Sequence, residues 1–289
     1  TDSIDPFNIG YVYNGPFLLG FSQWLIEQCK KDSIDRLFFL SREGKIMKSV
    51  YDIWSNDIVD APKSSYLELS RRAISVAAIE NMDDILKIAR TTYFTNRLER
   101  FLQTRYGLEI DDEQWRIIDS KFNYTRDSEI EVIDKNISHL IPLLKFLYSN
   151  ILNRARLELP ALNQYMMENG IYQDERIAVV DIGFGGTIQS YLNKLIDKKI
   201  NGYYLLTAKH SKDVADYHNV FIKGCFGEQL TRTPDAPMLY RRSFSVEKLL
   251  SCNDPQINYF SVSEDNKISN IYRKITREEE TPISIRNLL

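Results

Sequence analysis

Cysteine is scarce in this 289-residue sequence, which contains only Cys29, Cys225 and Cys252. Their odd number and wide separation argue against a disulfide framework. They also lack the short paired spacing that zinc ligands usually have. We therefore expect a protein of a reducing compartment without a structural disulfide or a zinc centre.

The sequence also lacks long apolar runs and an excess of charge of one sign. Runs such as residues 37–40 and 143–148 are too short to span a bilayer, and the N-terminus lacks the layout of a signal peptide. Lysine plus arginine (37) nearly balance aspartate plus glutamate (40), which gives no support for a nucleic-acid partner. We expect a cytoplasmic protein without a membrane span, and a peripheral contact with the inner face of the membrane stays open.

Several catalytic signatures are missing as well. There is no Gly-x-Ser-x-Gly elbow, no phosphate-binding Gly-x-x-x-x-Gly-Lys-Ser/Thr loop, and no Gly-x-Gly-x-x-Gly after a strand. His139, His210 and His218 have no cysteine or carboxylate at a metal-ligand spacing. No Asp-x-Asp occurs, which weakens the hypothesis of a glycosyltransferase that uses a nucleotide sugar without excluding it.

Short apolar segments that each end in polar residues indicate four buried strands. The helical patterns that follow the first and third of these segments favour an αβ repeat with a parallel sheet. We therefore predict an α/β fold with an open, mainly parallel sheet. The expected strands are residues 36–40, 65–69, 177–180 and 203–207.

The middle of the chain has a different pattern. Residues 74–170 show long helical periodicities with few glycines, which predicts a large helical insertion that acts as a lid or a side wall. Residues 1–73 and 171–289 would then form the two parts of the α/β core, the second with a C-terminal tail.

The glycine-rich turn at residues 181–187 carries the clearest chemical signal. Gly183, Gly185 and Gly186 can take backbone angles closed to other residues, so their N–H groups can converge on an anion near the positive helix end at Thr187. Asp181 at the strand end suits a hydroxyl or a metal ion. The same glycines also suit a tight turn that binds nothing.

Cations follow the other expected strands. Ligands of open parallel sheets bind at the carboxyl ends of the strands, so these cations and the glycine turn should surround one crevice. Such a crevice suits a ligand with two separated phosphate groups, for example a phosphorylated sugar diphosphate. An ordinary strand-to-helix turn capped by Ser41 and surface ion pairs of the arginines are the alternatives. The residues concerned are Ser41, Arg42, Gly44, Lys45, Arg71, Arg72 and Lys209.

Three sequence blocks resemble a known family. They are FLSREG at residues 39–44, YLELSRRA at 66–73 and VDIGFGGTIQ at 180–189. These blocks are similar to those of phosphoribosyltransferase-like modules of bacterial polysaccharide biosynthesis, which are often fused to a haloacid-dehalogenase-type phosphatase. The resemblance covers about the first 75 residues and residues 177–195.

The resemblance implies a sheet of phosphoribosyltransferase type and a glycosyltransferase activity. Such modules move 5-phosphoribosyl from phosphoribosyl pyrophosphate (PRPP) to a sugar hydroxyl of a lipid-linked or free glycan acceptor, such as an O-antigen or a capsule. Pyrophosphate leaves, Mg²⁺ is the cofactor, and a separate or fused phosphatase later acts on the ribofuranose product. This chain lacks the Asp-x-Asp nucleophile motif of that phosphatase, so it should not dephosphorylate its own product.

The resemblance also implies residue roles. Asp181 would bind ribose hydroxyls, a metal ion or the developing charge, and the 5-phosphate would lie on Gly183, Phe184, Gly185, Gly186 and Thr187. The pyrophosphate would lie on Ser41, Arg42, Gly44, Lys45, Arg71 and Arg72. Glu43 and Glu247 are candidates for the general base, and Lys209 is a further crevice residue. In the broader family the strand ends in two acidic residues and a longer loop, whereas this chain has one acid and a shorter loop.

Two other functions remain open. One is a non-catalytic module that binds a phosphorylated ligand or acts as a scaffold in a glycan-assembly complex. The other is a glycosyltransferase with a nucleotide-sugar donor.

Overall fold

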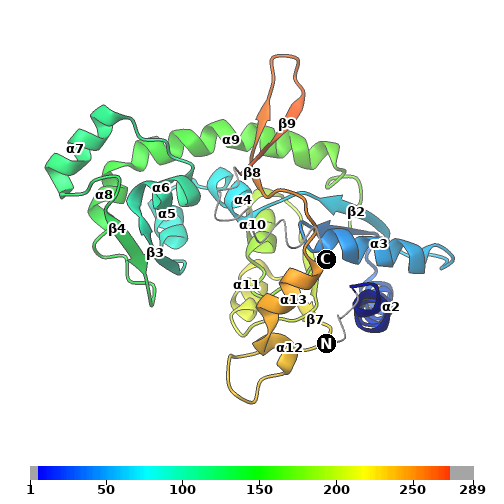
Figure 1. Ribbon diagram of the computed structural model, residues 1–289. Helices are drawn as coiled ribbons and strands as arrows, with labels where there is room; N and C mark the ends of the chain where they lie inside the picture. The colour runs from blue at the N-terminus through cyan, green and yellow to red at the C-terminus, as the bar shows by residue number, and fades with distance from the viewer. Residues whose placement is uncertain (1–5, 274–289) are drawn as a thin grey trace. The chain divides into compact units, whose positions relative to one another are not determined.

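The computed structural model describes residues 6–273 (Figure 1), so most of the expected C-terminal tail lies outside the described residues. The chain forms two compact units. Within the described residues, unit 1 comprises residues 6–70, 166–256 and 272–273, and unit 2 comprises residues 71–165 and 257–271. Residues 257–271, which the sequence pattern assigned to the α/β core, thus belong to the same unit as most of the expected insertion.

Unit 1 is built on a five-stranded sheet in which every neighbouring pair is parallel. The strand order is β2-β1-β5-β6-β7. This sheet confirms the predicted α/β class. The strands are β1 (Arg36–Leu40), β2 (Lys63–Leu67), β5 (Ile177–Asp181), β6 (Asn201–Tyr204) and β7 (Ile222–Gly224).

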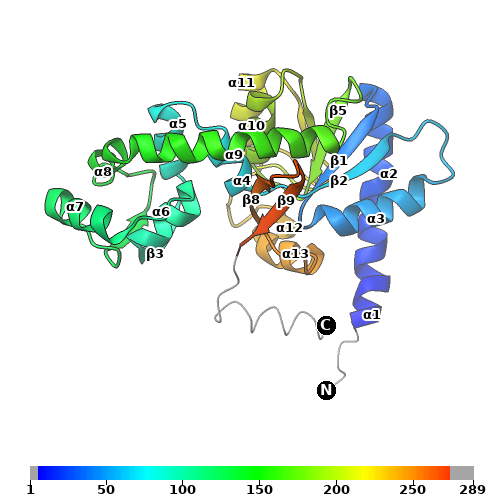
Figure 2. The ribbon, with the colours of Figure 1, turned by 90° about the horizontal axis from the view of Figure 1, so that it is seen from above.

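Helices cover both faces of this sheet (Figure 2). On one face, Phe39 and Val180 of the sheet share an apolar cluster with α2 (Gly15–Asp32) and α3 (Gly44–Ser55). Side chains alternate along a strand, so the neighbouring residues point to the other face. There the hydroxyl of Tyr204 donates to Gln189 of α10 (Thr187–Leu195) at 2.9 Å. The remaining elements of unit 1 are α1 (Pro6–Ile9), the π-helix η1 (Gly10–Asn14), α11 (Ser211–His218), α12 (Met238–Arg241) and α13 (Ser243–Leu250).

The strand order reverses direction between β1 and β5. The chain runs from β1 through α3 to β2 on one side, and from β5 through α10 and α11 to β6 and β7 on the other. Such a reversal opens a crevice at the carboxyl ends of the two central strands, because their following loops turn to opposite faces. By this general rule, a ligand of unit 1 is expected between the loops that follow β1 and β5.

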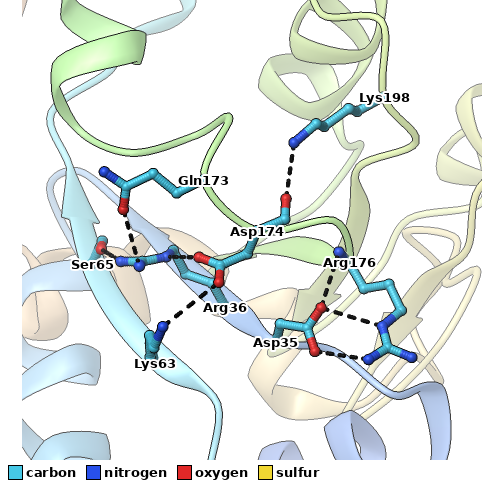
Figure 3. Close-up of polar contacts among 8 residues, drawn as sticks. All are labelled: Asp35, Arg36, Lys63, Ser65, Gln173, Asp174, Arg176 and Lys198. Atoms are coloured by element: carbon cyan, nitrogen blue, oxygen red, sulfur yellow. Dashed lines mark hydrogen bonds and ion pairs between the residues drawn. The ribbon is translucent and has the colours of Figure 1, made fainter.

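At the opposite, amino edge of the same sheet, polar contacts join the start of β1 to the segment that leads into β5 (Figure 3). Arg36 at the start of β1 donates to Asp174 at 2.5 Å, and Arg176 donates to Asp35 at 2.9 Å. Lys198 donates to the carbonyl oxygen of Asp174 at 2.9 Å. These contacts hold the segment that leads into β5 against the start of β1.

Unit 2 is mainly helical and has a core of its own. Its apolar cluster includes the fully buried Phe101, Tyr106 and Leu144. Two two-stranded sheets, which the sequence pattern did not predict, complete this unit. The elements that lie wholly or mostly in this unit are α4 (Arg71–Ala77), α5 (Met82–Ala89), β3 (Tyr93–Arg97), α6 (Leu98–Tyr106), α7 (Asp112–Phe122), β4 (Glu129–Val132), α8 (Ile141–Phe146), α9 (Tyr148–Glu168), β8 (Ile257–Val262) and β9 (Ile268–Tyr272).

Among residues 6–273, no helix combines the length and the apolar character needed to cross a membrane.

Candidate functional site

The candidate site lies at the carboxyl edge of the unit 1 sheet. Phe39 of β1 is in register with Val180 of β5, so the two strands end next to each other. Neighbouring strands are about 5 Å apart. The loop that follows β1 and the glycine loop that follows β5 (residues 181–187) therefore leave the sheet side by side.

The glycine loop is held tightly against the chain that continues from β6. Gly183 has a φ of +142°, and a Cβ added there would lie 2.6 Å from the carbonyl oxygen of Leu206. The N–H of Ala208 donates to the carbonyl oxygen of Phe184 at 2.7 Å. Only glycine satisfies both the backbone angle and the close approach at residue 183.

The glycine loop ends at the amino end of α10. Gly186 precedes the helix with a φ of +69°, and no side chain caps the first turn. The N–H groups of an uncapped first turn carry partial positive charge and lack an intrahelical acceptor. Thr187, the first residue of α10, is exposed, so this end of the helix is accessible to an anion.

Asp181 ends β5 and is half-buried. Its Oδ1 accepts a hydrogen bond from the N–H of Ile182 at 2.7 Å. A carboxylate offers about four lone-pair positions and is the type of group that accepts from a hydroxyl or binds a cation. Asp181 thus supplies the acidic group that the sequence pattern expected at this strand end.

The loop after β1 is fixed by bonds from its side chains. Ser41 Oγ donates to the carbonyl oxygen of Leu69 at 3.1 Å and accepts from the Leu69 N–H at 2.9 Å. Glu43 accepts from the N–H of Arg42 at 3.2 Å and from the hydroxyl of Ser251. Ser41 and Glu43 therefore join this loop to the chain after β2 and to the chain after α13.

The two cations of this loop differ in their partners. Lys45 Nζ donates to both carboxylate oxygens of Asp254, at 2.8 and 2.7 Å, and this bonding raises the pKa of the lysine. Arg42 is half-buried as a residue, and its guanidinium forms no hydrogen bond or ion pair with any other described residue. Arg42 is therefore the cation of this loop that can meet an anionic ligand without losing a protein partner.

A Cβ added at two glycines of the site would meet a neighbour, which is the backbone at Gly44 and a side chain at Gly185. A Cβ on Gly44 would lie 2.8 Å from the backbone carbon of Phe39, because α3 begins directly against β1. A Cβ on Gly185 would lie 2.1 Å from Nε2 of His210. The imidazole of His210 thus lies against the glycine loop.

His210 is the residue of this site that the sequence pattern missed. His210 has no metal-ligand spacing in the sequence, so the pattern gave it no role in a site. In the structure it follows β6 and reaches the loop after β5. Its position directly after the fourth expected strand is the signal that could have identified it, because the ends of parallel strands lie close together. Lys209 is a predicted crevice residue for that same reason. Both Lys209 and His210 are exposed.

One further expected site residue lies in the glycine loop, one lies on α13, and two lie outside unit 1. Phe184 packs edge-on against Tyr240 of α12, with ring centroids 5.6 Å apart. Glu247 lies on α13, one turn before Ser251. Arg71 and Arg72 begin α4 in unit 2.

Arg72 has partners within unit 2. Its guanidinium donates to both carboxylate oxygens of Glu158, which is 3% exposed, and to the carbonyl oxygen of Asn258 at 2.9 Å. Arg154 also pairs with Glu158, and both guanidinium groups lie over the ring of Tyr259, at 5.4 Å for Arg72 and 4.4 Å for Arg154. This network joins β8 to α4 and α9.

No group of three or more histidine, cysteine, aspartate or glutamate side chains is gathered for a metal ion anywhere in residues 6–273. Mg²⁺ usually binds through one or two carboxylates together with phosphate oxygens of the substrate. The single carboxylate of Asp181 beside the glycine loop is compatible with that mode.

Comparison with known proteins adds no relative: no family model matches the chain, and no curated protein is significantly similar to it.

Proposed function

We propose that unit 1 binds PRPP with Mg²⁺ at the carboxyl edge of its sheet and transfers 5-phosphoribosyl to a sugar hydroxyl of a surface-glycan acceptor. The observation that carries this proposal is the pairing of an uncapped helix end with Arg42, a cation that has no partner among the described residues. The first turn of α10 and the guanidinium of Arg42 belong to neighbouring loops at the point where the strand order reverses. Two separate groups for binding phosphate suit a donor with two separate phosphate groups.

Each part of the donor has a matching group in unit 1. The N–H groups of residues 183–187 suit the 5-phosphate, and Arg42 suits the pyrophosphate. Asp181 suits the ribose hydroxyls and would bind Mg²⁺ that arrives with the pyrophosphate. Mg²⁺ would stabilise negative charge on the leaving pyrophosphate.

In the reaction the bond between the anomeric carbon and the pyrophosphate oxygen breaks, and a bond from that carbon to the acceptor oxygen forms. The acceptor hydroxyl loses its proton to a base. Glu43 is the better-placed of the two candidate bases, because it lies in the loop that contains Arg42. Its bond from Ser251 fixes the direction of its carboxylate.

A specific observation favours a second candidate, a module that binds a phosphorylated ligand without turnover. Two of the cations expected on pyrophosphate already have carboxylate partners, since Lys45 pairs with Asp254 and Arg72 with Glu158. Fewer available cations give less stabilisation of a leaving pyrophosphate. Binding would remain, because the helix end and Arg42 suffice for an anion.

The test uses the whole chain with PRPP, Mg²⁺ and a panel of glycan acceptors. The proposed function predicts a raised melting temperature with PRPP, release of pyrophosphate, and an acceptor whose mass increases by one phosphopentose. A raised melting temperature without any mass increase supports the binding module. No change in melting temperature and no turnover contradicts both.

Asp181→Asn tests the site residue. We expect turnover to fall by about 10²-fold or more while PRPP still raises the melting temperature, because the amide keeps the shape but not the charge. The matched control is Asp213→Asn, which removes an exposed acid at the start of α11. Near-normal turnover of Asp181→Asn would remove this residue from the reaction.

A further inference from the structure

The exposed surface of α12 and α13 combines large apolar side chains with cations. Both helices belong to unit 1 and are drawn in orange in Figure 1. The exposed fractions of Met238, Phe244 and Leu249 are 70%, 69% and 56%. Exposed cations interrupt them in the sequence. We call this set the basic-apolar surface: Met238, Arg241, Arg242, Phe244, Lys248 and Leu249.

The opposite sides of the two helices are anchored to unit 1. Tyr240 is 6% exposed and packs on Phe184, and Leu250 is 2% exposed within the main apolar cluster. Arg232 donates to the hydroxyl of Ser243 at 3.1 Å. The exposure of the basic-apolar surface therefore belongs to a packed pair of helices.

This surface carries a local excess of positive charge. Residues 231–250 contain four lysine or arginine residues and two acids, Asp235 and Glu247, in a chain whose net charge is -3. Arg241, Arg242 and Lys248 form no ion pair with any other residue in the described part of the chain. Nζ of Lys248 lies 5.3 Å from the centre of the exposed Phe244 ring.

We propose that the basic-apolar surface binds a lipid bilayer that contains anionic phospholipids. At the boundary between headgroups and acyl chains, apolar side chains enter the acyl region while neighbouring cations meet lipid phosphates. A nucleic acid would satisfy the cations but leave Met238 and Leu249 in water. A bilayer with anionic headgroups satisfies both kinds of side chain.

The basic-apolar surface is connected to the candidate site through contacts of α12 and of the residue after α13. Ser251 directly follows α13, and its hydroxyl donates to Glu43 in the loop after β1. Tyr240 of α12 contacts Phe184 in the glycine loop. A membrane bound by α12 and α13 would therefore lie near the carboxyl edge of the sheet, where a lipid-linked acceptor could approach.

The inference goes beyond the proposed function, because vesicle binding is measured without donor or acceptor. The whole chain is sedimented with vesicles of phosphatidylcholine alone and with vesicles that also contain phosphatidylglycerol. We expect binding to the second kind only, and weaker binding as salt increases. Equal binding to both kinds, or binding to neither, overturns the proposal.

Two variants test the residues. The triple variant Arg241→Gln, Arg242→Gln, Lys248→Gln should lose about fivefold in partition coefficient for each cation removed. The double variant Phe244→Ser, Leu249→Ser should lose about 10²-fold or more, because two side chains no longer enter the acyl region. Thermal unfolding checks that both variants stay folded.

Matched controls remove the same kinds of side chain from exposed positions of unit 2. Arg116→Gln, Lys121→Gln, Lys145→Gln changes the net charge of the chain by the same amount, and Phe94→Ser, Ile133→Ser removes two exposed apolar side chains. We expect both controls to bind like the unsubstituted chain. If a control loses as much binding as its partner variant, the surface on α12 and α13 is not the membrane site.

Discussion

The two edges of the unit 1 sheet use charged residues in different ways. At the amino edge Arg36, Lys63 and Arg176 all pair with carboxylates. At the carboxyl edge Lys45 is paired, but Arg42 has no partner among the described residues and the first turn of α10 has no side-chain cap. Cations paired within the protein stabilise the fold, whereas a half-buried unpaired cation is suited to bind something else.

The pocket at the amino edge supports this contrast. A pocket of about 350 Å³ lies beside the Asp35–Arg176 pair and reaches Cys29. Burial raises the pKa of the Cys29 thiol to about 12, so it stays protonated at neutral pH and is a poor nucleophile. Among the charged groups that line that pocket, Asp35 and Arg176 have each other as partners, and the thiol of Cys29 is unreactive.

Gly183→Ala should have the largest effect. The added Cβ would lie 2.6 Å from a backbone oxygen, and the backbone angle is strained for any side chain, so we expect unfolding to become easier by about 3 kcal/mol. The loop must move, so the rise in melting temperature with PRPP should also disappear. Denaturant unfolding and ligand thermal shift measure the two effects.

Gly20→Ala is the matched control, because a Cβ at this exposed helical glycine would meet nothing within 4 Å. That change should leave stability unchanged or raise it by up to about 1 kcal/mol. A Gly183→Ala protein as stable and as responsive to PRPP as Gly20→Ala would show that the glycine loop is not the anion-binding element.

Arg36→Gln should lower stability by roughly 2 kcal/mol without changing the response to PRPP. The variant leaves the carboxylate of Asp174, whose side chain is 16% exposed, without its main partner, and it weakens contacts with Ser65 and Gln173. Denaturant unfolding provides the measurement. Arg97→Gln, which breaks an ion pair with both side chains more than 60% exposed, should cost less than about 0.5 kcal/mol. Equal losses in the two variants would contradict a stabilising role for the amino edge.

Arg42→Gln should weaken PRPP binding without lowering stability, which is the reverse of the effect expected for Arg36→Gln. Its side chain has no partner to lose within the described structure, so stability should change by less than about 0.5 kcal/mol. The Kd for PRPP should rise by about tenfold, because a charge-assisted contact with pyrophosphate is lost. Calorimetric titration measures the Kd, and Lys31→Gln, at the exposed end of α2, is the control. An unchanged Kd would separate Arg42 from the ligand.

The sequence predicted the centre of the sheet better than its surroundings. The runs that became β1 and β5 are continuously apolar because both faces of those strands are buried, and such runs are unambiguous. In contrast, β3 has the mostly exposed sequence YFTNR and lies inside the region 74–170 that was predicted to be helical. Few apolar residues in β3 face a core, so its pattern carried little strand signal.

The site could be predicted only where it depends on local sequence. The glycine turn and the polar loop after β1 are each contiguous, and parallel neighbouring strands bring them to one edge. The bond from Ser251 to Glu43 and the pair between Lys45 and Asp254 join residues more than 200 positions apart. Such pairings depend on where α13 packs in the fold, and the periodicity of a sequence does not specify that position. The pairings also decide which cations remain available to a ligand.

The smallest expected effect is a pH dependence at the amino edge. The hydrogen bond from Arg36 lowers the pKa of Asp174 below its ordinary value of 3.8. A carboxyl group whose pKa is lowered by folding contributes stability above its unfolded pKa and loses that contribution as the pH falls through the folded value. The difference in unfolding free energy between the unsubstituted chain and Asp174→Asn should therefore be full above pH 3.8 and shrink below it. Urea unfolding at a series of pH values measures this difference. Asp174→Asn keeps Arg36 and its contacts with Ser65 and Gln173, so the loss of unfolding free energy should be smaller than in Arg36→Gln. A loss that does not change with pH would mean that the ion pair between Arg36 and Asp174 does not stabilise this edge.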